Sequence, residues 1–127
     1  FGYSQSGTTT AYTDIKVIKY STVSGGTAAS PTMVPLDSGF SAATALVQNW
    51  TTTPTTQTAV GTVYSGRYFI GKTADNVTPD HDEIVFGNSQ RGSAALTLRG
   101  TSQWCGIDIS AVGATPLADM YVEWTEE

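Results

Sequence analysis

Hydrophobic and polar residues alternate with a period of two in several stretches of this chain, and no long stretch has a competing helical spacing. The alternation is clearest in residues 12–20, where Ile15 and Val17 would face one side and Lys16 the other. Residues 104–109 repeat the pattern. Such alternation is typical of strands that bury one face and expose the other.

Further strands are predicted where the same pattern returns. Residues 59–70 read as one long strand or two, and 44–50 could form either a strand or a helical turn. The remaining candidates are residues 32–36, 84–86, 96–99 and 120–124. About eight short strands without a βαβ rhythm predict an all-β fold, specifically an antiparallel β-sandwich of jelly-roll type.

The chain of 127 residues is long enough for one domain with a core of its own. Residues 12–127 are predicted to form that single β-sandwich domain. Residues 1–11 are rich in glycine and polar residues and are predicted to form an N-terminal arm. Phe1 and Tyr3 would then lie on a partner subunit.

Composition and charge exclude several types of fold and of binding partner. Charged residues make up only 13% of the chain and 13 residues are glycine, which argues against coiled coils and helix bundles. The formal net charge of −5 argues against nucleic acid or an anionic membrane as a partner. No apolar run approaches the roughly 18–20 residues that a membrane-spanning helix needs.

The residues that could carry catalysis are few. His81 is the only histidine, and flanking Asp80 or Asp82 could orient its imidazole in a hydrolase. No G-x-S-x-G nucleophile motif accompanies it, so this is the weakest hypothesis. Cys105 lies in an apolar strand and is predicted to be buried and inert. We therefore expect a protein that is not an enzyme and needs no cofactor.

Two other features could bind ligands. The acidic segment 75–83 offers oxygen atoms to Ca²⁺, but it lacks EF-hand spacing, so a solvated loop is favoured and no metal site is predicted. Trp50, Trp104 and Trp124 could stack on sugar rings. Because each lies in an alternating segment, a place in the core or in a subunit interface is favoured over a carbohydrate platform.

Three groups of segments together resemble small virion proteins of tailed bacteriophages over residues 12–127. The first group is Val34-Pro35-Leu36-Asp37-Ser38 with Ala42-Ala43-Thr44-Ala45; the second is Trp50-Thr51-Thr52-Thr53-Pro54-Thr55, Ala59-Val60-Gly61-Thr62-Val63 and Arg67-Tyr68-Phe69. The third is Ile84-Val85-Phe86-Gly87-Asn88-Ser89, Leu96-Thr97-Leu98-Arg99-Gly100-Thr101-Ser102-Gln103 and Val122-Glu123-Trp124-Thr125-Glu126-Glu127. The resemblance implies a β-sandwich component of the phage particle, of the capsid decoration or cement type.

Such a protein would bind the major capsid protein or other virion subunits and stabilise the head lattice. It would be assembled in the host cytoplasm, would reside on the capsid surface, and would form a homo-oligomer such as a trimer. The predicted partner-binding residues are Phe1, Tyr3, Trp124, Glu126 and Glu127, the last two in an acidic tail that could meet a basic capsid surface. The alternative is a carbohydrate- or receptor-binding module of a head fibre or tail.

Overall fold

The computed structural model describes residues 2–6, 11–70, 81–87, 94–112 and 117–126. Within these ranges the chain forms eight β-strands and no helix. The strands are β1 Gly2–Ser6, β2 Ala11–Ser24, β3 Thr27–Ala29, β4 Asn49–Thr52, β5 Thr56–Ile70, β6 His81–Glu83, β7 Trp104–Val112 and β8 Leu117–Tyr121.

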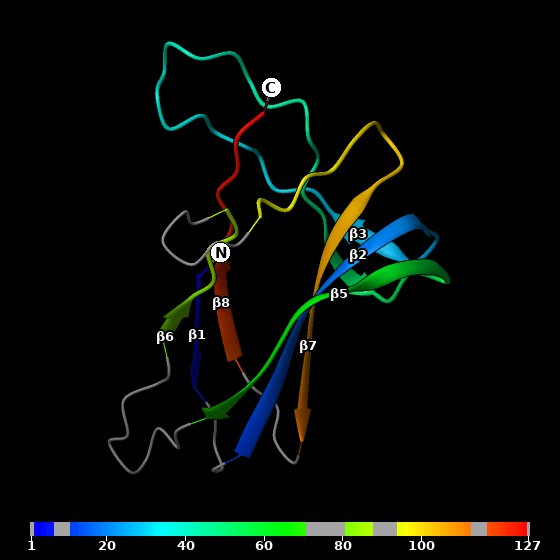
Figure 1. Ribbon diagram of the computed structural model, residues 1–127, viewed down its shortest axis with the longest axis vertical. Helices are drawn as coiled ribbons and strands as arrows, with labels where there is room; N and C mark the ends of the chain where they lie inside the picture. Colours follow the sequence, from blue (N-terminus) through cyan, green and yellow to red (C-terminus); the bar gives the residue numbers. More distant parts are fainter. Residues whose placement is uncertain (1, 7–10, 71–80, 88–93, 113–116, 127) are drawn as a thin grey trace.

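The strands form three antiparallel groups (Figure 1). One three-stranded sheet has the order β5-β2-β7, a second has the order β6-β1-β8, and β3 pairs with β4 in a two-stranded ribbon. The sheet β6-β1-β8 lies beside the lower half of β5-β2-β7, while the upper half of that sheet reaches toward the β3–β4 ribbon. The all-β, antiparallel prediction is confirmed for this part of the chain.

The core is built on one face of β2, the middle strand of the larger sheet. Ile15 and Val17 are buried on this face, together with Thr13. The face continues onto the neighbouring strands, because Ile15 pairs with Ile109 on β7 and Val17 pairs with Ile107. Directly opposed residues in an antiparallel pair share a face, so these side chains form one apolar stripe across the sheet.

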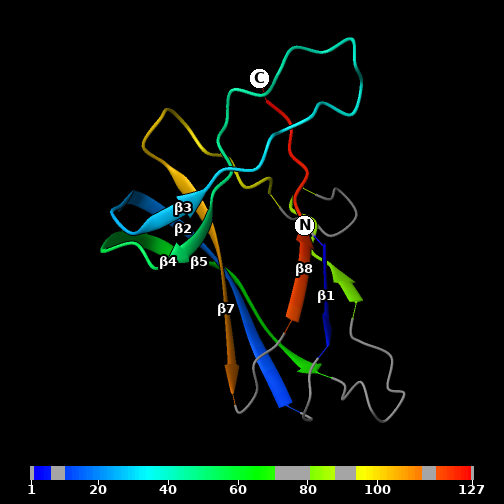
Figure 2. The same ribbon diagram turned by 180° about the vertical axis from the view of Figure 1, so that it is seen from behind.

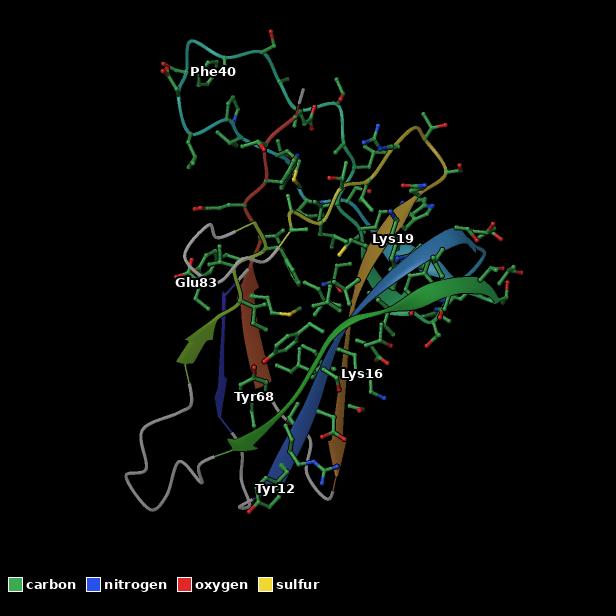
Figure 3. All side chains as sticks on the ribbon, in the orientation of Figure 1. Tyr12, Lys16, Lys19, Phe40, Tyr68 and Glu83 are labelled. Carbon is green, nitrogen blue, oxygen red and sulfur yellow. The ribbon has the colours of Figure 1, made fainter. Side chains whose placement is uncertain are left out.

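The opposite face of β2 is polar in its lower half. Asp14 pairs with Arg67 on β5, and the guanidinium donates to the carboxylate through Nε at 2.6 Å and Nη2 at 3.0 Å. Lys16 lies opposite Asp108 of β7. Figure 3 shows Lys16 directed away from β8 and Tyr68 directed toward it. One face of β2 therefore carries the polar pairs and the other face carries the buried apolar side chains.

The β3–β4 ribbon continues the β2–β5 pairing after a sharp reversal of the chain. The last pair before the reversal is Ser24 with Thr56, and the first pair after it is Thr27 with Thr52. Gly25 and Gly26 make the bend with φ angles of 76° and 72°. A Cβ on Gly26 would lie 2.5 Å from the carbonyl oxygen of Thr52, so no larger residue fits there without strain. Figure 2 shows the ribbon returning from this bend.

Strand β5 runs unbroken over 15 residues, and its register against β2 shifts at three points, the third of them at Ser21 of β2. The register against β2 shifts between Val17 and Ile18, where β5 has one extra residue, Val63. It shifts again between Lys19 and Tyr20, where the extra residue is Val60. Residues 59–70 thus belong to one bulged strand.

Several predicted strands are absent from the structure. Residues 32–36, 84–86 and 96–99 have no regular structure, and the strand expected at 120–124 instead runs from Leu117 to Tyr121. Pro35 removes a hydrogen-bond donor from the first of these segments, and Gly87 and Gly100, both with positive φ, end the other two. In the ambiguous 44–50 region, only Asn49 and Trp50 belong to a strand.

The N-terminal segment differs from the predicted arm. Gly2–Ser6 is the central strand of a sheet, pairing with β6 on one side and β8 on the other. The backbone of Tyr3 lies opposite Asp82 and Met120 of the same chain. Because both edges of β1 are hydrogen-bonded within the chain, Gly2–Ser6 belongs to the folded domain and not to an extended arm.

Gly66 pairs with Ile15 and lies on the same face of the sheet, so a substitution at Gly66 tests the packing of that face. A Cβ at this position would meet the hydroxyl oxygen of Tyr64 at 2.6 Å and Cε2 of Tyr68 at 2.8 Å. The two phenol groups hydrogen-bond to each other above the glycine. We expect Gly66→Ala to lower the free energy of unfolding by about 1–3 kcal/mol, because the two rings must separate.

The matched control is Gly61→Ala on the same strand, where a Cβ would meet nothing within 4 Å. Urea denaturation monitored by tyrosine and tryptophan fluorescence would compare the two variants. Equal midpoints for both variants would contradict the packing described here.

Candidate interaction site

The most exposed large apolar side chains of the described structure gather on one segment. We call residues 30–48, which join β3 to β4 without regular structure, the apolar loop. It projects beyond the sheets at one end of the molecule (Figure 1). Its exposed side chains and their exposed fractions are Leu36 91%, Val34 78%, Phe40 72% and Leu46 72%. A surface of this kind is typical of an interaction site.

A tight turn shapes the far end of the apolar loop. The Asp37 carboxylate accepts a hydrogen bond from the backbone N–H of Gly39 at 2.8 Å, and the Asp37 carbonyl accepts one from the N–H of Phe40 at 3.0 Å. An aspartate that bonds to the backbone two residues later is typical of a fixed turn. Phe40 is consequently held at the far end of the loop (Figure 3).

The C-terminal tail fastens the apolar loop near its second half. Glu126 Oε2 accepts hydrogen bonds from Thr44 Oγ1 at 2.6 Å and from Thr44 N at 2.9 Å. Glu126 Oε1 accepts from Ala45 N at 2.9 Å and from Trp124 Nε1 at 3.0 Å. We call this arrangement the Glu126 clamp. It joins residues 82 positions apart in the chain.

The clamp favours the charged form of its carboxyl group. The hydrogen bond from the Thr44 hydroxyl, followed by those from Trp124 and from the backbone of Ala45 and Thr44, lowers the pKa of Glu126 from 4.5 to about 2. Hydrogen bonds donated to a carboxylate stabilise it against protonation. At neutral pH the clamp is therefore ionised and fully formed.

The three tryptophans lie in three different parts of the structure. Trp50 is half-buried on β4, opposite Ala28, and Trp104 is half-buried at the start of β7, opposite Tyr20. Trp124 lies in the tail after β8 with 38% of its surface exposed. Of the three, Trp124 alone is exposed as a sugar-stacking residue would need to be, and its indole N–H already donates to Glu126.

The structure describes only some of the predicted partner-binding residues. Phe1 and Glu127 lie outside the described residues, and for Tyr3 the structure describes the backbone in β1. Glu126 and Trp124 lie together in the clamp, where both carboxylate oxygens accept hydrogen bonds from the same chain. Their role toward a partner stays a prediction; their role within the chain is to hold the apolar loop.

The residues considered for catalysis and metal binding are placed only in part. His81 is in β6, its backbone opposite Ser4, and Asp80 and most of the acidic segment 75–83 lie outside the described residues. Among the residues that are described, no group of three or more histidine, cysteine, aspartate or glutamate side chains could hold a metal ion.

Cys105 is exposed, so its predicted burial is wrong. It follows the alternation of Ile107 and Ile109, but on β2 it lies opposite Lys19 and not opposite an apolar residue. The apolar stripe therefore ends at the pair of Val17 with Ile107, and the next pair on this face is Lys19 with Cys105. Partial desolvation still raises the pKa of the Cys105 thiol above its usual value of 9.0.

Comparison of the chain with protein-family models, curated proteins and solved structures finds no match. In the described ranges, no helix has the length and apolar character needed to cross a bilayer.

Glu126→Gln tests the clamp. Because the pKa in the folded protein lies below the ordinary value of 4.5, the stability that the carboxylate contributes is complete above pH 4.5 and is lost as the pH falls toward 2. We expect the variant to unfold at lower urea concentration than the wild type at pH 7. The difference between the two should shrink between pH 4.5 and 2.

Faster amide hydrogen exchange at Thr44 and Ala45 in the same variant would locate the effect at the loop. Glu123→Gln, an exposed position on the same tail, is the matched control and should leave both measurements unchanged. A Glu126→Gln deficit that is the same at pH 7 and pH 2 would contradict the clamp.

Cys105 should be modified in the native protein because it is exposed, but slowly near pH 7, because its raised pKa leaves little thiolate. Iodoacetamide labelling followed by mass spectrometry would measure this, with a rate that still rises above pH 9. Labelling only after denaturation would show that the thiol is covered.

Proposed function

We propose that this chain is a structural component of a bacteriophage particle, of the capsid decoration type, that self-associates and stabilises the head lattice. One observation supports this most directly. Of the large apolar side chains that the structure describes, thirteen are exposed, whereas only Ile15, Val17 and Ile84 are buried. A chain that leaves so much apolar surface in water is suited to permanent association with other subunits.

The finer architecture belongs to the same proposal. We infer that β5-β2-β7 and β6-β1-β8 are the two layers of a β-sandwich with jelly-roll-like connections. The apolar stripe around Ile15 and Val17 supports a second layer on that side of the larger sheet, and the polar pairs Asp14–Arg67 and Lys16–Asp108 support a solvent-facing outer side.

Stabilisation of the head would follow from binding to the assembled lattice alone. A protein that binds the assembled state and not the free capsid subunits stabilises that state by about 2.7 kcal/mol per site at a free concentration of 100 times Kd. The partner is the major capsid protein or another virion subunit on the capsid surface. The acidic end of the chain and its net charge of −5 would favour a basic patch there.

The second candidate is a carbohydrate- or receptor-binding module of a head fibre or tail. The exposed Trp124 favours it, because the ring of an exposed tryptophan can stack on a sugar. Trp124 is, however, the donor of a hydrogen bond to Glu126, so its orientation is explained without a ligand.

The deciding experiment is co-sedimentation of the purified chain with empty heads of the phage that encodes it. We expect binding that saturates at a fixed number of copies per capsomer, weakens at high salt, and raises the temperature at which the heads disassemble. Bovine serum albumin at the same concentration is the control for trapping. Heads that bind no protein under saturating conditions would contradict the proposal, and glycan-array binding would then support the second candidate.

A further inference from the structure

Strand β7 forms an open edge of the larger sheet. It pairs with β2 along one side over all nine of its residues, and in the part of the chain that the structure describes no strand pairs with its other side. Figure 2 shows β7 along the margin of this sheet. The backbone N–H and C=O groups on that side can therefore bind a further extended chain.

Strand β7 lacks the features that commonly protect an edge. Its sequence, Trp104–Val112, contains no proline and no lysine, and its register against β2 has no shift. Asp108 is its only charged residue, and the alternation of the strand places it on the face opposite to that of Ile107 and Ile109. An edge with such a regular register can accept another strand without rearrangement.

The apolar stripe of the sheet is incompletely covered at this edge. Ile15 and Val17 on the middle strand are 0% and 1% exposed, whereas their partners Ile109 and Ile107 on β7 are only half-buried. A strand added beside β7 would place its own side chains directly next to these two isoleucines. Apolar side chains at those positions would continue the stripe and remove more of the isoleucine surface from water.

The strand that already pairs with β7 indicates which sequence fits there. On β2, the triplet Ile15-Lys16-Val17 lies opposite Ile109-Asp108-Ile107, so a basic residue between two apolar ones meets an acidic residue between two apolar ones. The side chains of β7 point above and below the sheet, so a strand on either side meets the same three of them. The open edge thus favours another apolar-basic-apolar triplet.

A second copy of this chain offers no such triplet on the edge strands that the structure describes. Strands β3, β4, β6, β7 and β8 contain neither lysine nor arginine. Strand β5 contains Arg67, but Gly66 precedes it and its guanidinium already donates to Asp14. The triplet of β2 lies in the middle of the sheet, where both sides of the strand are paired.

We propose that the open edge of β7 binds an extended segment of another protein in which a lysine or arginine stands between two apolar residues. The segment adds to the sheet as an antiparallel strand, with its backbone bonded to β7 and its basic side chain beside Asp108. The inference goes beyond the proposed function and does not depend on it, because it is tested with the purified chain and without heads.

The test is fluorescence anisotropy of the full chain with a fluorescein-labelled peptide that has the sequence of residues 12–20, YTDIKVIKY. We expect saturable binding, which becomes at least about threefold weaker when the peptide carries Lys16→Glu, because like charges then lie side by side. In the chain, Asp108→Lys should reverse this preference and Asp108→Asn should remove it. Glu123→Lys, the same change of charge on the exposed tail, is the matched control and should leave the preference unchanged.

Methylation of the peptide's backbone N–H groups tests the strand pairing itself. Alternate residues of an added strand face β7 with their N–H groups, so one of the two alternating sets of methyl groups should weaken binding at least about tenfold and the other should not. Equal effects of the two sets, no preference between the charge variants, or no binding up to about 1 mM would overturn the inference.

Amide hydrogen exchange of the complex would locate the peptide. We expect added protection in β7 and unchanged protection of Ile15 and Val17. Loss of protection at these two residues would show that the peptide has replaced β2, and dissociation of a self-associated chain by the peptide would show that β7 pairs with a second copy. Either result would overturn the inference while the proposed function would stand.

Discussion

The whole arrangement depends on the burial of one face of β2. Ile15 and Val17 are its fully covered apolar residues, and the pairs they form with Ile107 and Ile109 extend the same apolar stripe across the sheet. Burying a valine or isoleucine side chain contributes about 1.5–3 kcal/mol, so these two residues together stabilise the fold by several kcal/mol. Thr13, also buried, has no hydrogen-bond partner for its hydroxyl oxygen, which reduces that stability.

Two features outside this face shape other parts of the chain. The bend at Gly25 and Gly26 returns the β3–β4 ribbon, and the Glu126 clamp joins the tail to the apolar loop. Neither device buries much apolar surface. Each instead satisfies backbone groups or uses a conformation that only glycine adopts readily, and together they give the long connection between β3 and β4 a defined course.

The strands with strong alternation could be predicted from the sequence, and those without it could not. Residues 12–20 and 104–109 alternate because the sheet buries one of their faces, and both are strands. Gly2–Ser6 has no such pattern, and its pairing is decided by β6 and β8, which lie more than 70 residues away. Conversely, 96–99 alternates but has no regular structure.

Only some residues of the candidate interaction site could be predicted from the sequence. Val34, Leu36 and Phe40 stand out as apolar residues among turn formers, but the interpretation of 32–36 as a strand would have placed Val34 and Leu36 together on one face of a sheet. The clamp could not be predicted, because nothing local distinguishes Glu126 from Glu123. A hydrogen bond across 82 residues exists only once the fold has brought the tail beside the loop, as Figure 1 shows at the C-terminal end.

The two bulges of β5 have a consequence for the edge of the larger sheet. A 15-residue strand at the edge of a sheet would be a template for uncontrolled β-aggregation if it were regular. Val63 and Val60 interrupt its register, so a second strand cannot add along its length with continuous hydrogen bonds. Addition of another strand along this edge is thereby disfavoured, whereas the opposite edge of the sheet, β7, pairs with β2 without a register shift.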